Sequence, residues 1–179
     1  EAVSYAEEGY GLQKRRAEEA LIEQGTGMAW TIVRPCHIYG PGSQLGCLPE
    51  HGRDPKLIER VLAGEELRLV GGGYFLQQPL LARDLADCML SLAGNERAVQ
   101  QIFGVAGPDV VESVTYYRII ADLLGKELRV EETPVTEYFA EHPEAAPFLC
   151  HRFYDLSRLS VSGAAVPATS LEDGLAEHV

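Results

Sequence analysis

The stretch Ala29-Trp-Thr-Ile-Val-Arg-Pro-Cys-His-Ile-Tyr-Gly-Pro-Gly42 decides the fold. Its first five residues form a short apolar run with β-branched side chains, a pattern that is typical of a buried strand. Pro35 ends that strand, because proline has no N–H to donate to a strand ladder. Tyr39-Gly-Pro-Gly42 then predicts a loop, so one buried strand leads here into irregular chain.

Helix and strand signals alternate on both sides of this strand. A helix rich in strong helix formers is predicted from about Tyr5 to Gln24, and a second buried strand from Gln101 to Val105. The alternation predicts the α/β class, and because only two buried strands are convincing, we expect the edge of a parallel sheet without its centre. The other predicted elements are helices at 55–63, 84–93, 113–124, 135–141 and 171–179, a strand at 128–132, and a hairpin formed by 66–70, the turn Gly71-Gly72-Gly73 and 76–81.

The composition is that of an ordinary globular protein. The chain has 179 residues, of which 46% are hydrophobic and 23% charged, and this excludes disordered and collagen-like classes. The length suits one domain or a piece of a larger one. No run approaches the roughly eighteen apolar residues of a membrane span, and the N-terminus lacks the pattern of a signal peptide. Because the first residue is Glu1 and not Met, the sequence is compatible with a fragment or a processed start.

The charge balance and the cysteines argue against further kinds of partner. Fifteen Lys and Arg against 27 Asp and Glu give a net charge of −12, and no basic run is visible that could bind a phosphate backbone. The four cysteines have no spacing that a zinc site would need, and their usage indicates a reducing cytoplasm. We therefore expect a cytoplasmic protein with no nucleic-acid partner, no membrane association and no metal.

Tyr10-Gly-Leu-Gln-Lys14 is the strongest local signal for chemistry. A tyrosine and a lysine four residues apart on a helix lie on one face, about one turn from each other. The ammonium group favours the phenolate and so lowers the pKa of the tyrosine. Such a tyrosine can exchange a proton with a substrate hydroxyl while hydride moves to or from a nicotinamide. The same spacing is also common on solvated helix faces, so the pair alone decides nothing.

Several short motifs follow one another from Tyr10 to Leu175. They are Tyr10-Gly-x-x-Lys14-x-x-x-Glu18, Val33-Arg34-Pro35, Ile38-Tyr39-Gly40-Pro41-Gly42, Leu57-Ile58 to Gly64-Glu65, Ala82-Arg83-Asp84-Leu85-Ala86, Tyr154-Asp155-Leu-Ser-Arg158-Leu159 and Ser170-Leu171-Glu172-x-Gly174-Leu175. Each motif alone is weak. The ordered set resembles the C-terminal half to two-thirds of an extended short-chain dehydrogenase/reductase, the NAD-dependent epimerase/dehydratase family, without the N-terminal Gly-rich cofactor-binding segment.

The resemblance implies a fold in two parts. The first is a partial Rossmann-like unit, with edge strands and the Tyr-Lys helix, and the second is a small α+β substrate-binding lobe. Residues 1–42 would form the C-terminal portion of the dinucleotide-binding domain. Residues 43–179 would form mainly the lobe, with 82–107 returning to the Rossmann-like sheet.

The same resemblance implies roles for individual residues. Tyr10 would be the catalytic acid/base, and Lys14 its activator and a hydrogen-bond donor to the ribose of NAD or NADP. Pro35, at the carboxyl end of its strand, would lie against the nicotinamide, in the crevice where open α/β sheets bind ligands. His37 falls where many members place a substrate-contacting residue; a loop histidine without a role is the equal alternative.

Two positions depart from the pattern of members that act on nucleotide sugars. Those members usually carry an arginine where this chain has Gln77, and glutamine cannot grip a diphosphate in a bidentate way. A second arginine is usual upstream of the Asp155 position, and Arg152 lies too near Asp155 to match it cleanly. Gln77 and Arg152 remain candidate substrate-binding residues, but a nucleotide-sugar substrate is in doubt.

The resemblance therefore predicts part of an NAD(P)-dependent epimerase, dehydratase or reductase. It would move hydride between nicotinamide and a small substrate with a hydroxyl or carbonyl group. It also implies a homodimer that forms through the Tyr-Lys helix. The alternatives are a non-catalytic cofactor-sensing or RNA-associated binding protein of the same fold, or an inactive fragment. We expect the chain by itself to be inactive, because the phosphate-binding segment lies upstream of it in the family.

Overall fold

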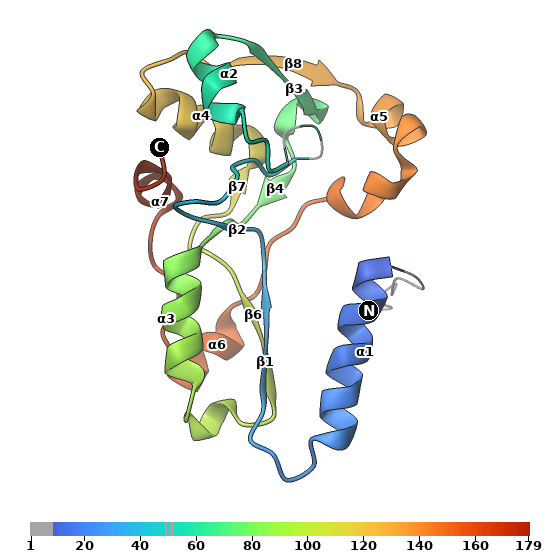
Figure 1. Cartoon of the computed structure of the whole chain (residues 1–179), viewed down its shortest axis with the longest axis vertical. Helices are drawn as coiled ribbons and strands as arrows, with labels where there is room; N and C mark the ends of the chain where they lie inside the picture. The colour runs from blue at the N-terminus through green and yellow to red at the C-terminus, as the bar shows by residue number, and fades with distance from the viewer. Residues whose placement is uncertain (1–8, 49, 51) are drawn as a thin grey trace.

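The computed structural model describes residues 9–48, 50 and 52–179, and Figure 1 shows them as two connected parts. One part contains two long strands that lie side by side, with helices beside them. The other part is a lobe of short strands and helices. The helices are α1 (Gly9–Gln24), α2 (Leu57–Ala63), α3 (Ala82–Leu92), α4 (Ser113–Leu123), α5 (Val135–Glu141), α6 (Ser157–Ser162) and α7 (Leu171–Ala176). The strands are β1 (Thr31–Pro35), β2 (Ile38–Tyr39), β3 (Glu66–Val70), β4 (Leu76–Gln77), β5 (Leu80–Leu81), β6 (Gln101–Val105), β7 (Val111–Glu112) and β8 (Arg129–Thr133). Short 3-10 turns are η2 (Gly71–Gly73), η3 (Glu96–Ala98) and η4 (Pro143–Phe148).

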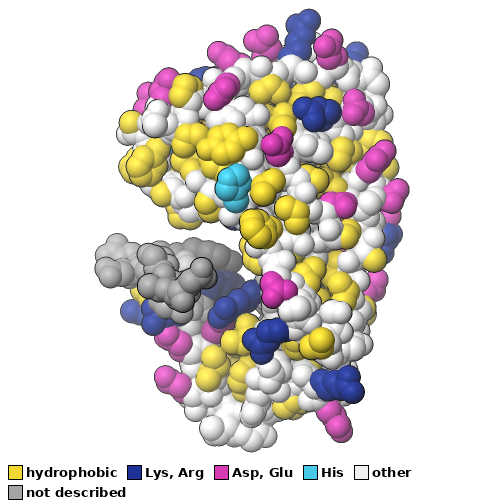
Figure 2. Space-filling model, turned by 180° about the vertical axis from the view of Figure 1, so that it is seen from behind, with side chains coloured by type: hydrophobic (Ala, Val, Ile, Leu, Met, Phe, Trp, Pro, Cys, Tyr) yellow, Lys and Arg dark blue, Asp and Glu magenta, His cyan; other side chains and the backbone are white. Residues whose placement is uncertain are grey.

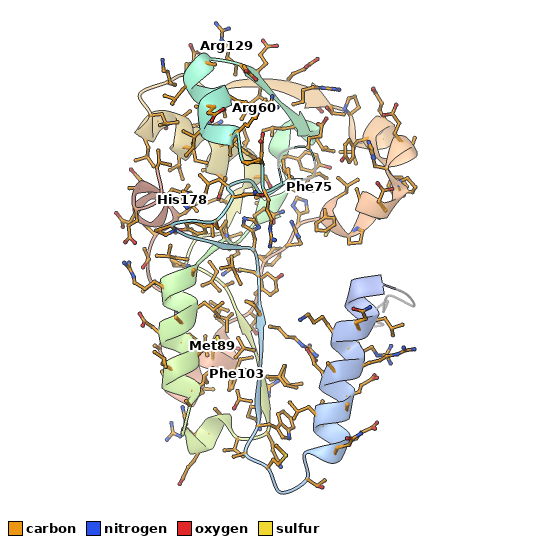
Figure 3. All side chains as sticks on the ribbon, in the orientation of Figure 1. Arg60, Phe75, Met89, Phe103, Arg129 and His178 are labelled. Carbon is orange, nitrogen blue, oxygen red and sulfur yellow. The ribbon has the colours of Figure 1, made fainter. Side chains whose placement is uncertain are left out.

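The two strands that the sequence predicts as buried pair with each other. β1 and β6 run parallel, and Ile32 lies opposite Ile102. On one face of the pair, Phe103 packs in a small core with Cys88 and Leu92 of α3 (Figure 3). This parallel pair with its covering helix confirms the expected α/β class and the partial Rossmann-like arrangement.

α1 lies along the other face of this pair, and the predicted helix ends where α1 ends (Figure 1). The described contact between α1 and the strand includes an ion pair, in which Nε of Arg34 lies 3.1 Å from both carboxylate oxygens of Glu18. No described side chain of α1 is buried, and Ile22 is 43% exposed. Because an exposed ion pair contributes about 1 kcal/mol at most, α1 has little packing to hold it in this chain.

The hairpin predicted around the three glycines is wrong. β3 pairs in parallel with β8, with Leu67 opposite Val130, and the following segment does not return along β3. That segment is divided instead, because β4 pairs antiparallel with β7 while β5 pairs parallel with β2. Pro79 stands between the two pieces, where it has no N–H for a continuous ladder. The lobe closes over a larger core that includes Leu67, Leu69, Tyr116, Tyr117 and Ile120.

Two polar side chains join segments that are far apart in the sequence. The carboxylate of Asp84, in the first turn of α3, accepts hydrogen bonds from the backbone N–H groups of Ala168 and Thr169 and from the Thr169 hydroxyl, at 2.7–2.9 Å. Gln78 donates from Nε2 to the carbonyl of Gly107 and accepts from the N–H of Tyr154. Asp84 thus holds the C-terminal segment on α3, and Gln78 holds the crossing segment near β6.

Candidate substrate and cofactor site

The N-terminal end of α1 points toward the segment that contains η4 (Figure 1). Tyr10 and Lys14 lie on the first turns of this helix; the Tyr10 side chain lies outside the described part of the structure, and Lys14 is exposed. Seen from behind, the surface is hollowed between the two parts of the molecule (Figure 2). The first turns of α1, which carry the predicted catalytic pair, therefore lie beside this hollow.

The carboxyl end of β1 carries the other residues that the sequence associates with the nicotinamide and the substrate. Pro35 is the last residue of β1 and is exposed, opposite Val105 of β6. The chain stays close to β6 for one more residue, since the Cys36 N–H donates to the Val105 carbonyl at 3.0 Å. His37 follows and turns into the lobe. In open α/β sheets, ligands bind at this carboxyl edge of parallel strands.

A cavity of about 460 Å³ opens next to His37. Its size lies in the range of small-molecule sites. The structure brings two of the predicted substrate-binding residues, His37 and Arg152, into its wall. The full lining is His37, Gly46, Cys47, Leu48, Gly52, Arg53, Glu144, Ala145, Phe148 and Arg152.

One wall of the cavity is a loop fixed by the core of the lobe. The hydroxyl oxygen of Tyr117, on α4, accepts hydrogen bonds from the N–H groups of Cys47 and Leu48 at 3.0 and 3.2 Å. Leu45 and Asp54 form a β-bridge where the loop closes. Because both backbone N–H groups have a buried partner, this wall is held in place before any ligand binds.

Arg152 belongs to the opposite wall. Its backbone N–H donates to the carbonyl of Leu76 at 2.8 Å, so the segment after η4 lies against β4. Its guanidinium lies over the ring of Phe148, 5.5 Å from the ring centre. Nε of Arg152 is buried and has no hydrogen-bond partner among the described residues. Arg152 therefore borders the cavity and can donate a hydrogen bond from Nε to a ligand.

His37 is held in its neutral form. Burial, together with smaller contributions from the positive charges of Arg152 and Arg53, lowers its pKa to about 4. Nε2 of His37 is buried and has no hydrogen-bond partner among the described residues. A neutral imidazole can donate or accept at this atom, so His37 presents one hydrogen-bonding group and no charge near neutral pH.

Acidification should destabilise the fold through His37. The unfolded chain has the ordinary pKa of 6.5 and the folded chain about 4, so the unfolded state binds this proton more tightly. The contribution of His37 to the free energy of unfolding is therefore fully present above pH 6.5. It decreases by up to about 3 kcal/mol as the pH falls toward 4. Urea unfolding measured between pH values of about 7 and 4 checks this. His37→Gln should remove this part of the pH dependence and His142→Gln should keep it; an unchanged slope in H37Q would contradict the assignment.

Two cysteines near the cavity are protonated thiols. Burial raises the pKa of Cys36 and of Cys47 to about 12. The Cys36 thiol donates to the Gln78 carbonyl at 2.7 Å. A thiol at such a pKa is a poor nucleophile, so both side chains act here as buried packing groups.

Gln77 lies elsewhere. It is only 1% exposed, on β4 opposite Val111, and it does not line the cavity. Its Nε2 has no hydrogen-bond partner among the described residues. The structure thus brings His37 and Arg152 together and leaves Gln77 behind the wall, on the strand that Arg152 contacts.

Several residues of the cavity carry no motif by which the sequence alone would identify them. Arg53 lies in a segment that the sequence shows only as irregular, and it adopts a φ of 59°, which is uncommon for a residue with a side chain. Phe148 and Glu144 come from η4, whose sequence carries no motif. The basic character of Arg53 was the one available signal, and nothing in the sequence placed it near His37.

The described part of the chain contains neither a membrane-spanning helix nor a cluster of metal-ligating side chains. Within residues 9–48, 50 and 52–179, no helix is both long enough and apolar enough to cross a bilayer. Over the same ranges, no three His, Cys, Asp or Glu side chains come together as they would around a metal ion.

Comparisons with known proteins point to one family. The profile of the NAD dependent epimerase/dehydratase family matches residues 1–106. A dTDP-4-dehydro-6-deoxy-D-allose reductase from Streptomyces sp is 29% identical over 162 residues, which are 89% of this chain and 46% of the reductase. The chloroplast stem-loop binding protein of 41 kDa b from Arabidopsis thaliana is 31% identical over 98 residues, 55% of this chain and 24% of that protein.

Solved structures show the same fold. The crystal structure of UDP-glucuronic acid 4-epimerase from Bacillus cereus in complex with NAD superposes with a TM-score of 0.72 at 16% sequence identity. The match covers 98% of this chain and 51% of the epimerase. The chain thus spans about half the length, or less, of the relatives it matches.

Proposed function

Because the chain belongs to the NAD dependent epimerase/dehydratase family, we propose that it supplies the catalytic helix and the substrate-binding lobe of an NAD(P)-dependent epimerase, dehydratase or reductase. One observation carries the proposal. The cavity lined by His37 and Arg152 opens beside the carboxyl end of β1, where Pro35 is exposed, and α1 begins beside the hollow in the surface. Substrate, nicotinamide and proton-transfer groups can meet there.

The chain's own residues suit the nicotinamide end of the cofactor. Pro35 is exposed at the edge where ligands of parallel sheets bind, and Lys14 is exposed on α1. The sequence contains no Gly-rich G-x-G-x-x-G turn that could cradle the phosphates. We assign Pro35 and Lys14 to the nicotinamide ribose end and the phosphate cradle to residues outside this chain.

The chemistry divides between cofactor and protein. When bound, NAD or NADP accepts or supplies the hydride. Tyr10 takes the proton from a substrate hydroxyl, or returns it to a carbonyl oxygen, and the positive charge of Lys14 favours its ionised form. His37 and Arg152 hold the substrate in the cavity, so that the reacting carbon faces the nicotinamide side.

The domain division and assembly follow the same proposal. Residues 1–42 belong to the dinucleotide-binding domain and 43–179 mainly to the substrate lobe, with 82–107 returning to the sheet through α3 and β6. α1 forms the contact of a homodimer in the cytoplasm. The exposure of its described side chains, including Ile22, supports this, because the helix has little packing against the rest of this chain.

A turnover assay tests the proposal. The intact protein is mixed with NAD⁺ or NADP⁺ and a panel of alcohols, sugars and nucleotide sugars, and reduced cofactor is followed by its absorbance. We expect turnover with at least one small hydroxylated substrate. Cofactor binding without any turnover across the panel would contradict catalysis and favour a cofactor-sensing protein.

One comparison favours a second candidate function. The likeness to a chloroplast stem-loop binding protein over 98 residues is compatible with an RNA-associated role for this fold. The net charge of −12 opposes it, because RNA binding needs clustered cations that release counterions. An electrophoretic mobility-shift assay with a labelled RNA stem-loop and the intact protein tests this role. A shift at micromolar protein and moderate salt would support it.

A further inference from the structure

Two arginines border the cavity without a carboxylate partner. Arg53 lies in the loop wall and Arg152 in the segment after η4, and neither forms an ion pair with a described acidic residue. Nε of Arg152 is also buried without a hydrogen-bond acceptor. A buried donor without a partner costs free energy, so the cavity is built to receive an acceptor that the protein does not provide.

Both positive charges act at the same place. Arg53 and Arg152 line the same cavity as His37, and the charge of each contributes to the lowering of the His37 pKa that burial mainly causes. His37 itself adds no charge near neutral pH, but its buried Nε2 lacks a partner as well. Three nitrogen-bearing side chains thus converge on one cavity, and two of them are cationic.

The wall contains a single described carboxylate, that of Glu144. Its side chain is 75% exposed at the rim, where it lies 3.3 Å from Nδ1 of His142. Two arginines, one glutamate and a neutral histidine give the described part of the lining one net positive charge. A ligand group with one negative charge balances this lining, whereas a diphosphate carries more negative charge than it can neutralise.

The rest of the wall is apolar. Leu48 and Ala145 are buried in it, and Phe148 is half exposed beneath the guanidinium of Arg152. A planar guanidinium that rests on an aromatic ring keeps its edge free for a bidentate carboxylate. The anionic group of a ligand would therefore lie next to an apolar surface that can pack against the ligand's body.

We propose that this cavity selects a small monocarboxylate, with the carboxylate bound by Arg152 and Arg53 and the apolar body packed against Phe148 and Leu48. His37 donates a hydrogen bond to the carboxylate or to a neighbouring hydroxyl. The inference rests on the proposed function, because it names the substrate class of the same site.

Binding of three probes to the intact protein tests the charge requirement. Benzoate carries one negative charge, benzamide has the same shape without charge, and phenyl phosphate carries up to two charges. Titrations followed by the NMR signal of the Arg152 Nε–H should show benzoate binding about tenfold or more tightly than benzamide. Equal binding of benzoate and benzamide would overturn the proposal. Tighter binding of phenyl phosphate than of benzoate would overturn it as well, and would indicate a site for a phosphate group.

Variants locate the binding. Arg152→Gln and Arg53→Gln should each weaken benzoate binding about tenfold, with Arg152→Lys in between because lysine keeps the charge without the bidentate fork. Arg68→Gln is the matched control: this exposed arginine of β3 lies 3.5 Å from Glu131 and does not line the cavity. If R152Q fails to fold, R53Q, at an exposed position, still decides. Equal weakening in R68Q and R53Q would mean binding to surface charge, and would overturn the proposal.

The probe titration separates this inference from the proposed function, because it needs neither cofactor nor turnover. Benzoate binding in a protein that never reduces nicotinamide would sink the proposed function and leave the carboxylate site. Turnover with neutral substrates, unaffected by R53Q and without benzoate binding, would do the reverse.

Discussion

Replacing Tyr10 by phenylalanine should lower turnover by about 10²–10⁴-fold, the usual contribution of a positioned general acid or base. The change removes only the hydroxyl, and with it the group that exchanges the substrate proton. Binding of cofactor and substrate, and the thermal unfolding midpoint, should change little, because the substitution keeps the aromatic ring and removes a single oxygen atom. Steady-state assays on the intact protein measure the effect as a loss of kcat with little change in KM.

A matched tyrosine serves as the control for this experiment. Tyr74 is 45% exposed in the lobe, stacks on Phe75 and does not line the cavity, so Tyr74→Phe should keep normal turnover. Lys14→Met should reduce turnover less than Tyr10→Phe does, because the acid/base group remains and only its activation is lost. Near-normal turnover in Y10F would remove Tyr10 from the mechanism.

Gly107→Ala should be the most damaging single-methyl change, with a loss of about 3 kcal/mol in the free energy of unfolding. A Cβ at this position would collide with the backbone carbonyl of Pro79. A backbone atom cannot swing aside as a side chain can, and the Gly107 carbonyl also accepts the hydrogen bond from Gln78. The segment between β4 and β5 would have to move away from the end of β6.

Gly104→Ala is the matched comparison, three residues earlier in the same chain segment. Its Cβ would meet only Cδ1 of Tyr154 at 3.8 Å, an ordinary contact, and its φ is not in the left-handed region. The added side chain restricts the unfolded chain, so G104A should be neutral or stabilising by up to about 1 kcal/mol. Urea unfolding of both variants measures the difference; equal effects would show that the close approach at Gly107 is not what limits the site.

Local pattern was enough to predict the elements that depend on local chemistry. Residues 101–105 form the predicted strand, and α1 ends at Gln24, just before Gly25-Thr26-Gly27, as predicted. The pairing of strands could not be predicted in the same way. β3 pairs with β8, which lies far along the chain, and no local signal distinguishes that partner from residues 76–81. The hairpin expectation failed for this reason.

The candidate site divides in the same way. Tyr10 and Lys14 are found from helix spacing, and Pro35 and His37 from their place after a strand, because these relations are local. The residues that surround His37 in space are not close to it in the sequence. Arg53, Arg152 and Phe148 reach the cavity only through the packing of the loop wall and η4. Their convergence, and the unpartnered nitrogens it produces, could not be derived from spacing along the chain.

We propose that α1, the end of β1 and the cavity serve one reaction. An experimental structure of the intact protein with bound NAD⁺ tests this most directly. We expect the nicotinamide ring against Pro35, with the Tyr10 hydroxyl on one side and the opening of the cavity at His37 and Arg152 on the other. A nicotinamide bound away from Pro35, or a Tyr10 hydroxyl that points away from both ring and cavity, would contradict it.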